Sequence, residues 1–590
     1  MAIEIKHYSF AKKDNYKWFF FGTNYLKLKK LEKIKGSNNR LSLTENISQT
    51  CKKEKKNYLN WIEKQRINFH DSLNWSMNTV SSRNNFNSNF FIYIIQFIAL
   101  KNFIKINKIS NIVVYTDRYF LVKFLNQNFK SEVTTLKNFF INALTYCEKF
   151  YFILKGILNY LKIFHFFIVH KFLAFKTKNK KTIFPSGEIY LFHDLISSEK
   201  INNSVVQSRY FGDYPDWLSK KKNVYVSSWF FRNIKNKFSF YKHLRNIKSF
   251  IPEDFLSIQD YIFCFANGLK SAFSINDKIN YPELDIKILI NIEKLNNLCS
   301  KSPIFFRYIP SINKWSKNIK KIYYFDHYQN QPYEHPIRYA LSRLNLDYKS
   351  IGYYHSLHSE DYLAYQFHDN EWNSKIKPDI LLCPNIICKN QLKQQGIPEK
   401  KIKVISDLQR KTINIKEIKE NNNLLIVLSL FDEINYEILL KILSINNILM
   451  KKFKINIIIR PHPYSSIKRI LKNIKLNKLP SNWSISNNSL EIDLLKSKSV
   501  VAMRSAIATD IVLNGNILIT PTCELNLGEN YLDFLTKKFE ILRSIKIEDL
   551  VEQLKKIYVS KDKTLIQKNL EVKKYLQENF NPQNFEEIIV

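Results

Sequence analysis

The chain is 590 residues long, 45% hydrophobic and 14% aromatic. This length exceeds what one hydrophobic core supports, and the apolar content excludes a disordered chain, so two or more folded domains are expected. The formal net charge is +39, and the lysines that contribute to it are spread along the chain. This distribution predicts a generally basic surface that attracts anionic lipids and substrates. It does not predict the clustered basic stripe that binds nucleic acid.

Short apolar runs alternate with longer helix-patterned stretches, which is typical of parallel α/β units. We therefore expect residues 1–410 to form an N-terminal, Rossmann-like lobe. Its expected strands cover residues 17–21, 112–116, 188–192, 223–227, 320–325, 349–354, 379–383 and 401–405.

A helical insertion at about 143–180 interrupts this pattern. Its segment 151–175 is rich in bulky apolar residues, and as a helix it gathers one apolar face from Ile153, Ile157, Leu161, Phe164 and Ile168. Lys155, Lys162 and Lys171 interrupt the segment too often for a membrane span. Two interpretations remain open: a basic amphipathic helix at the membrane interface, which we favour slightly, or a helix packed on the first lobe's own sheet.

The polar stretch 411–423 is expected to be a linker between two lobes. Residues 424–545 then follow a regular order of strand and helix and predict a second Rossmann-like lobe. The expected strands are 424–428, 454–459, 483–486, 500–503 and 516–520, and the expected helices are 434–450, 466–474, 489–496 and 505–514. The terminal segment 546–590 is helical and long enough to cross back onto the first lobe.

Polar residues crowd the ends of two expected strands in the first lobe. Asn330, Gln331 and Glu334 follow the first of these strands, and His355 and Ser356 follow the second. Ligands bind at the carboxyl ends of strands in open α/β sheets, so Asn330, Gln331 and Ser356 are expected on the acceptor side. His355 can take a proton from an attacking hydroxyl, and Glu334 is a second base or the residue that orients one. Structural hydrogen bonding is the alternative for both.

The run Ile457-Ile-Ile-Arg460-Pro-His462-Pro463 carries the strongest signal of the second lobe. Two prolines fix a rigid loop directly after an apolar strand, where a ligand is expected. Arg460 offers a planar fork to phosphate oxygens, and His462 can donate a hydrogen bond to phosphate, with protonation near neutrality allowed by its reference pKa. The alternative is that both side chains merely cap the strand.

The next strand of this lobe runs into Arg504 and Ser505. We expect Ser505 to be the N-cap of a helix whose free backbone N–H groups form an anion site. Thr509 and Asp510 lie one turn in, and Asp510 can accept a hydrogen bond from a ribose or sugar hydroxyl. An ordinary capping role for Ser505 is the alternative.

Metal and disulfide chemistry are not expected. Asp326, His327 and His335 match no standard ligand spacing, and none of the seven cysteines forms a CxxC pair. Free thiols indicate a reducing compartment, and the first residues lack the apolar core of a signal peptide, so a cytoplasmic location is expected.

Four runs resemble the bacterial surface carbohydrate biosynthesis proteins, which are predicted GT-B proteins: FDHYQNQPYEHPIRYAL (325–341), IGYYHSLHSEDYLAY (351–365), KPDILLCPN (377–385) and LKQQGIPEKKIKVI (392–405). Asn74-Trp-Ser76, Arg83-Asn84-Asn85 and Phe211-Gly-Asp-Tyr-Pro-Asp-Trp217 also fit. The second lobe is similar to CDP-glycerol glycerophosphotransferases, capsule Kdo transferases and bacterial sialyltransferases. These share a His-Pro motif, here His462-Pro463, and a Ser/Thr-rich segment ending in an acidic residue, here Asp510. They commonly have Glu at that position.

The resemblance implies a metal-independent GT-B glycosyltransferase of surface polysaccharide biosynthesis, with two Rossmann-type lobes facing a cleft. It implies no cofactor, a nucleotide-sugar donor that is CMP- or CDP-linked, and a glycan or lipid-linked acceptor. Arg460, His462, Arg504, Ser505, Thr509 and Asp510 would bind the donor, and His355 with Glu334 would deprotonate the acceptor. Peripheral contact with the cytoplasmic face of an anionic membrane is also expected. The alternatives are a CDP-polyol phosphotransferase, a sugar-nucleotide epimerase, a nucleic-acid-binding protein and a non-catalytic assembly scaffold.

Overall fold

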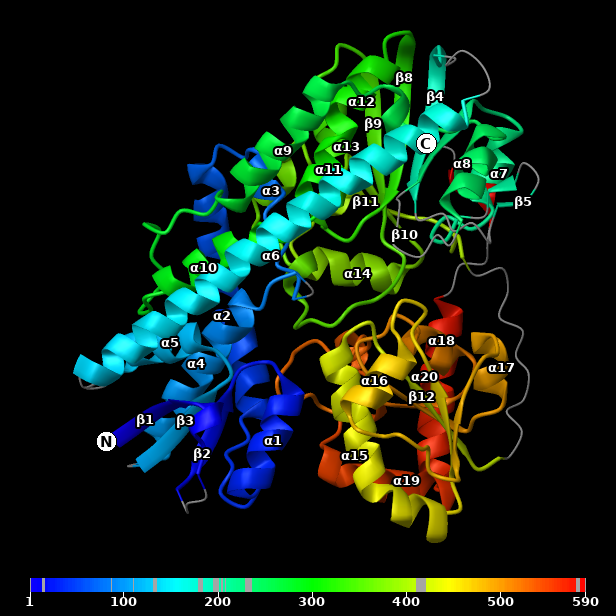
Figure 1. Cartoon of the computed structure of the whole chain (residues 1–590). Coiled ribbons are helices and arrows are strands. Elements are labelled where there is room, and N and C mark those ends of the chain that lie inside the picture. The colour runs from blue at the N-terminus through cyan, green and yellow to red at the C-terminus, as the bar shows by residue number, and fades with distance from the viewer. Residues whose placement is uncertain are drawn as a thin grey trace.

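The computed structural model describes residues 2–12, 16–85, 87–109, 111–130, 135–178, 184–194, 201–202, 205–206, 208–228, 236–409, 421–579 and 584–588. These residues form three parallel sheets in three bodies (Figure 1). All thirteen predicted strands occur, and each begins and ends within two residues of its predicted bounds. The predicted linker at 411–423 lies almost wholly outside the described residues, since β12 begins at its last residue.

The six-stranded sheet forms the centre of the first lobe, in the order β11-β10-β9-β8-β4-β7 with every pair parallel. Its strands are β4 (Gly187–Asp194), β7 (Val224–Ser228), β8 (Ile319–His327), β9 (Asp347–Tyr353), β10 (Ile380–Cys383) and β11 (Ile402–Val404). The helices of this lobe are α7 (Tyr214–Ser219), α8 (Lys237–Arg245), α9 (Ile258–Ala272), α10 (Lys287–Asn297), α11 (Ser302–Phe306), α12 (Tyr308–Trp315), α13 (His335–Leu341) and α14 (Ile386–Gln394).

The second lobe is a five-stranded parallel sheet in the order β14-β13-β12-β15-β16. Its strands are β12 (Asn423–Val427), β13 (Asn456–Arg460), β14 (Trp483–Ile485), β15 (Ser499–Ala502) and β16 (Ile517–Ile519), and its helices are α15 (Asp432–Lys451), α16 (Ile467–Asn473), α17 (Leu490–Leu495) and α18 (Ala508–Leu513). The central strands β12 and β15 are almost wholly apolar because helices cover both faces of the sheet. Ser466 and Ser489 accept hydrogen bonds from the first turns of α16 and α17, which fixes where these helices begin.

A third, smaller sheet divides the range 1–410, which the sequence analysis treats as one lobe. It has the order β1-β3-β2 and consists of β1 (Ala2–His7), β2 (Trp18–Phe21) and β3 (Asn111–Thr116). The helices of this N-terminal unit are α1 (Tyr25–Lys35), α2 (Thr44–Asn68), α3 (Leu73–Ser76), α4 (Phe90–Ile106) and α5 (Tyr119–Phe129). The strand β1 is absent from the predicted set, because a short alternating run of charged and apolar residues at a chain end carries little signal.

The N-terminal unit packs against the second lobe. Trp18 and Phe20 share a buried core with Ile426. The backbone N–H of Tyr25 donates to Glu433 at 2.8 Å, and Arg40 forms an ion pair with Glu524 at 2.5 Å. The first residues of the chain therefore pack against a lobe that begins some four hundred residues later in the sequence.

The last helices are α19 (Leu550–Tyr558) and α20 (Lys563–Glu578). Leu554 lies in the core of the second lobe, whereas Val572 and Leu576 of α20 pack in a cluster with residues of both lobes. Farther along, Phe585 packs on Tyr214 of the first lobe, at a ring separation of 5.5 Å. The C-terminal segment thus runs from the second lobe to the first.

The insertion forms one helix, α6 (Thr135–Lys176), which runs diagonally along the outside of the first lobe and the N-terminal unit (Figure 1). Its inner side is partly polar: Asn159 donates to the carbonyls of Leu298 and Ser300, and Lys171 donates to the carbonyl of Glu253. A Cβ at Gly156 would lie 2.8 Å from Leu298, so glycine allows the close approach of α6 to this part of the lobe.

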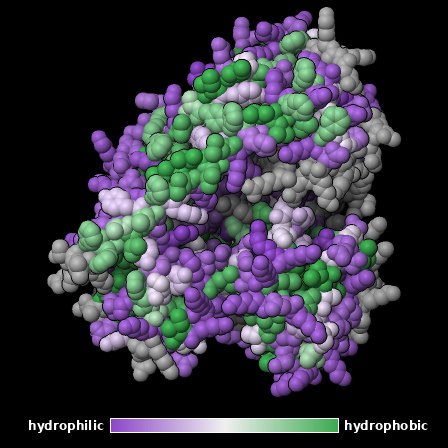
Figure 2. Space-filling view, viewed as in Figure 1, coloured by the Kyte–Doolittle hydropathy of each residue, from purple (hydrophilic) through white to green (hydrophobic). Residues whose placement is uncertain are grey.

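The outer side of α6 is apolar. All five residues of the predicted apolar face are exposed, including Leu161 at 60% and Phe164 at 55%. The neighbouring helix α9 packs on α6 through Phe265 and Phe167 and exposes further apolar side chains. We call this surface the apolar ridge; Figure 2 shows it as a green band along α6. Its exposed residues are Tyr151, Ile153, Leu154, Ile157, Leu158, Leu161, Phe164, Ile168, Phe172 and Phe175 of α6 and Ile258, Ile262 and Leu269 of α9.

One helical segment of the described chain, Asn138–Lys176, is long and apolar enough to cross a membrane by length and composition, and 22% of its most apolar stretch is buried. The expectation that lysines exclude a membrane span is therefore wrong on composition alone. The packing of one side of α6 on α10, α11 and α8 instead places the helix along the protein surface.

Candidate active site between the lobes

A cavity of about 450 Å³ lies between the first and second lobes and is lined by loops that follow strands of both sheets. The loops after β8 and β9 come from the first lobe, and those after β13 and β15 come from the second. Parallel strands end at the same edge of a sheet, so each lobe turns its ligand-binding edge toward the other. The chain thus has a GT-B type fold, as predicted: two Rossmann-like lobes that face a common cleft.

His355 and Ser356 line this cavity from the first lobe, as the sequence predicts. The His355 ring is half-buried, with its centroid 4.9 Å from that of Tyr210. The Ser356 hydroxyl is buried and has no hydrogen-bond partner among the described residues. This hydroxyl can therefore serve a ligand without first losing an internal bond.

His462 lines the same cavity from the second lobe. Its Nδ1 accepts a hydrogen bond from the backbone N–H of Tyr464 at 3.2 Å, so in the neutral ring the proton lies on Nε2. Burial, with a smaller contribution from Arg209, lowers the pKa of His462 to about 4. This pKa lies below the reference value that allowed protonation near neutrality, so at neutral pH His462 is a neutral donor through Nε2.

Arg460 borders the cavity, but part of its fork is already engaged. Its Nη1 donates to Asp493 at 2.6 Å and to the Asn488 carbonyl at 2.8 Å. Asp493 is fully buried and also accepts from Ser486. Arg460 therefore fixes the segment that precedes and opens α17, in addition to any contact with a ligand.

Arg504 projects from the loop after β15 and lines the cavity. Its backbone has φ 52°, an unusual left-handed conformation for a non-glycine residue, and its N–H donates to the Glu529 carbonyl at 2.6 Å. The guanidinium lies 3.9 Å from the Phe431 ring and 5.5 Å from that of Tyr362. These contacts hold a cation at the edge of the cleft.

Ser505 is not the N-cap of the following helix. The helix α18 starts at Ala508, three residues later than predicted, and its N-cap residue Ile507 makes no side-chain capping bond. Arg504, directly before this segment, has a left-handed backbone, and residues 506–507 form a turn before the helix begins. Ser505 and Asp510 still line the main cavity, whereas Thr509 lines a small adjoining space beside His355.

Asn330 and Gln331 do not reach the main cavity. Asn330 is buried, accepts a hydrogen bond from Lys377 at 2.7 Å and donates to the Ala364 carbonyl at 3.0 Å. Gln331 accepts a hydrogen bond from Asn87 at 3.0 Å. Both amides thus hold their loop in place, and neither lies among the side chains that line the cleft.

Glu334 also lies behind the cavity wall. It is fully buried and accepts a hydrogen bond from the backbone N–H of Gln329, at 2.9 Å. Burial, reinforced by the nearby Asp326 carboxylate, raises the pKa of Glu334 well above its ordinary value, although Arg338 opposes this. A buried carboxyl that does not line the cavity does not reach the hydroxyl of a substrate there. The structure therefore supports a positioning role for Glu334, through Gln329, which does line the cleft.

Several further residues line the cleft although the sequence did not single them out as site residues, among them Arg209, Tyr210 and His327. Tyr210 stacks on His327 with a centroid distance of 3.9 Å, and Arg209 donates to the Tyr464 hydroxyl of the second lobe at 2.8 Å. Their position in the sequence could have identified two of them, because Arg209 and Tyr210 directly precede the run 211–217 that contributes to the family resemblance.

Among the described residues, no group of three or more His, Cys, Asp or Glu side chains is arranged to hold a metal ion. Asp326 forms an ion pair with Arg338, and His335 Nδ1 lies 3.1 Å from the Ser76 carbonyl. The three residues that could form a metal cluster on paper, Asp326, His327 and His335, thus have other contacts.

No protein-family model and no curated protein matches the chain. Several solved structures are similar. A glycotransferase of kitacinnamycin is 10% identical, with TM-score 0.38 over 69% of this chain and 99% of that chain. The UDP-GlcNAc 2-epimerase of Methanocaldococcus jannaschii, in complex with UDP-GlcNAc and UDP, is 13% identical, with TM-score 0.35 over 67% and 100% of the two chains. S. aureus MnaA with UDP is 10% identical, with TM-score 0.36 over 69% and 95%.

Transferases and epimerases thus both occur among these similar structures, and identities of 10–13% do not distinguish their activities. The class of this protein is defined by its own geometry: a two-lobed α/β protein with one interlobe cleft. Within that class, the residues of the cleft must decide the activity.

Proposed function

We propose that the chain is a glycosyltransferase that binds a nucleotide-activated sugar in the interlobe cleft and transfers the sugar to a glycan or lipid-linked acceptor. One observation supports this above all. A half-buried histidine of the first lobe, His355, lines the same cavity as a phosphate-suited set from the second lobe, His462 and Arg504. A base and a leaving-group site on opposite walls are what an acceptor attack on a sugar–phosphate bond requires.

In the proposed reaction, the donor phosphate lies beside His462 Nε2 and the Arg504 guanidinium. The acceptor hydroxyl attacks the anomeric carbon and transfers its proton to His355, while the bond from that carbon to the phosphate oxygen breaks. The leaving phosphate retains the electron pair of the broken bond, and hydrogen bonding from His462 with the positive charge of Arg504 stabilises it. Asp510 accepts a hydrogen bond from a hydroxyl of the donor.

A surface-polysaccharide role and a cytidine-linked donor come from the family resemblance, and we retain both as proposals. A thermal-shift screen against CMP-, CDP-, UDP- and GDP-linked sugars tests the donor, because a ligand that binds only the folded state raises the apparent stability. Release of free nucleotide that requires an added acceptor would support transfer. Epimerisation of a UDP-sugar without acceptor would contradict it, as would transfer of a polyol phosphate from CDP-glycerol.

We also propose that the apolar ridge rests on the cytoplasmic surface of an anionic membrane. A helix in water normally turns its apolar side inward, but α6 turns Asn159 and Lys171 inward and exposes Phe164 and its apolar neighbours. Such a face is suited to the boundary of headgroups and acyl chains, and the basic charge of the chain attracts anionic lipids. This placement would bring a lipid-linked acceptor to the enzyme.

A further inference from the structure

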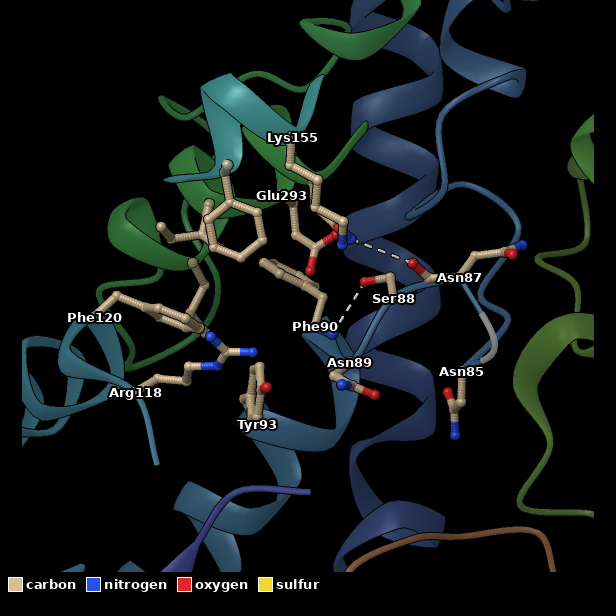
Figure 3. Close-up of a pocket in the computed structure, with 14 residues that line it drawn as sticks. Asn85, Asn87, Ser88, Asn89, Phe90, Tyr93, Arg118, Phe120, Lys155 and Glu293 are labelled. Atoms are coloured by element: carbon tan, nitrogen blue, oxygen red, sulfur yellow. Dashed lines mark hydrogen bonds between the residues drawn. The ribbon is translucent and has the colours of Figure 1, made fainter. Parts of the chain in front are cut away.

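A second cavity, of about 270 Å³, lies where the N-terminal unit meets the insertion and the first lobe (Figure 3). The first turn of α4 and the loop after β3 form one side, and α6 and α10 form the other. No residue of this cavity belongs to the interlobe cleft or to the predicted site.

The walls of this cavity combine amides with aromatic rings. In Figure 3, Asn85, Asn89 and Ser88 come from the segment that leads into α4, and Phe90, Tyr93 and Phe120 contribute aromatic rings to the same cavity. A sugar presents hydroxyls that both donate and accept hydrogen bonds, and it also presents an apolar C–H face. Amides can form hydrogen bonds with the hydroxyls, and aromatic rings can pack against the C–H face. This composition is therefore suited to a carbohydrate. The full set of polar lining residues is Asn85, Asn87, Ser88, Asn89, Arg118, Lys155, Glu293 and Asn296.

Glu293 of α10 gives independent evidence for a ligand. It is 6% exposed, it lines the cavity, and its Oε2 has no hydrogen-bond partner among the described residues. Burial raises its pKa to about 7, although hydrogen bonding from Ser88 and Asn296 acts in the opposite direction. An unsatisfied buried carboxyl oxygen is costly, so a ligand hydroxyl that bonds to it would remove a penalty.

Two cations set the charge of the cavity. Arg118 extends into it from the loop after β3, and Lys155 extends into it from α6, toward Glu293 (Figure 3). The N-terminus of α4 adds partial positive charge, since its N-cap Asn89 makes no side-chain capping bond. Two cations, Arg118 and Lys155, face the single carboxyl of Glu293, so positive charge exceeds negative charge here.

We propose that this cavity binds an acidic sugar unit, one that carries a carboxylate or a phosphate, and that this unit belongs to the acceptor glycan. That this unit belongs to the acceptor glycan rests on the proposed function, whereas the binding of an acidic sugar in this cavity does not. Asn87 of this cavity donates to Gln331, and Gln329 and Tyr333, two residues to either side, line the interlobe cleft. The two cavities are therefore linked through one short loop. The helix that supplies Lys155 also carries the apolar ridge, where the lipid of a lipid-linked acceptor would lie.

Saturation-transfer NMR and calorimetry on the full chain test this proposal with three probes: D-glucuronate, glucose 6-phosphate and glucose. We expect at least one of the acidic sugars to bind about tenfold more tightly than glucose, as one charge-assisted contact would produce. The two acidic probes distinguish a carboxylate from a phosphate ligand. The double variant Arg118→Gln/Lys155→Gln should lose the preference. The matched control Lys101→Gln/Lys105→Gln makes the same charge change on the exposed far end of α4 and should keep it.

Glu293→Gln should retain binding, because an amide also donates and accepts, whereas Glu293→Leu should lose it. Equal affinity for the three sugars, absence of binding, or an unchanged preference in the Arg118/Lys155 variant would overturn the proposal. His462→Ala separates this site from the cleft, because it should weaken nucleotide binding and leave sugar binding intact. If the proposed function is wrong, the parent chain itself will show neither nucleotide binding nor transfer, while its preference for the acidic sugar is preserved.

Discussion

Arg209 Nη1 donates a hydrogen bond to the Tyr464 hydroxyl at 2.8 Å, and this contact joins a loop of the first lobe to the loop after β13 of the second. The same guanidinium contributes to the low pKa of His462. A cation of the first lobe thus lies beside the proposed phosphate site and contacts the second lobe.

The first prediction concerns this cation. Arg209→Gln should weaken binding of a nucleotide-sugar by about tenfold to a hundredfold, since a hydrogen bond to a charged group contributes about 1.5–3 kcal/mol. Calorimetric titration measures the change. Arg343→Gln removes an exposed arginine of the same lobe, outside the cleft, and should bind the donor as the parent does. Equal affinity in both variants would exclude Arg209 from the donor site.

The second prediction separates the two histidines. His355→Ala should lower turnover by about 10²–10⁴-fold, the usual effect of removing a general base, while donor affinity stays nearly unchanged. His462→Ala should instead weaken donor binding and lose about 2–4 kcal/mol of transition-state stabilisation. Donor titration together with a turnover assay measures both effects. The reverse pattern would assign the donor to the first lobe.

The third prediction concerns pH. The pKa of His462 is about 4, and a bound phosphate must raise it, because negative charge favours the protonated ring. Donor affinity should therefore increase as the pH falls from 8 toward 5, with uptake of a proton on binding. Calorimetry in two buffers of different ionisation enthalpy counts this proton, and a nucleotide-sugar diester does not titrate in the range. His462→Gln should bind without pH dependence; proton uptake that persists in this variant would contradict the assignment.

The fourth prediction concerns stability. Arg83 donates to Glu371 at 2.7 and 3.0 Å, and Lys377 lies 2.9 Å from the same carboxylate, with all three side chains buried. Glu371→Gln would leave two buried cations without their counter-charge, so the free energy of unfolding should fall by about 3–5 kcal/mol. Denaturant unfolding measures this. Glu399→Gln, an exposed carboxylate that also contacts two lysines, is the control and should change stability little.

The same pair of variants gives a pH test. Burial by itself would raise the pKa of Glu371, but Arg83 and Lys377 lower it to about 2, below its ordinary value of 4.5. The stabilisation from Glu371 is therefore complete above about pH 4.5 and decreases as the pH falls toward 2. The stability difference between parent and Glu371→Gln should shrink over that range. A constant difference would mean that the carboxylate is not ion-paired.

The fifth prediction concerns the apolar ridge. Leu161→Ser/Phe164→Ser/Ile168→Ser should reduce sedimentation with anionic vesicles by more than tenfold, since each buried large apolar side chain contributes about 1.5–3 kcal/mol. Ile67→Ser/Ile106→Ser removes two exposed apolar residues elsewhere and should sediment like the parent. Lys162→Gln should weaken binding more than Lys171→Gln, because Lys162 is exposed whereas Lys171 already donates to protein carbonyls. Unchanged sedimentation of the triple variant would assign the ridge to another partner.

The sequence by itself determined thirteen of the strands, their parallel α/β order and several of the residues that line the cleft. Apolar runs such as Leu424–Leu428 can only be buried strands, and the residue after such a strand must lie at the sheet edge. His355, His462, Arg504 and Asp510 were identified in this way. The apolar face of α6 was equally evident, because helical periodicity depends on local spacing alone.

The tertiary structure decided which polar side chains remain available to a ligand. Asn330, Gln331 and Glu334 have the same local pattern as His355, but contacts with residues far away in the chain, such as Asn87 and Lys377, place them behind the cavity wall. Whether a side chain reaches a cavity depends on such distant partners, and so do burial and the pKa. The separate N-terminal sheet, the cation Arg209 and the second cavity around Glu293 likewise arise only where distant segments meet, and local sequence does not specify those meetings.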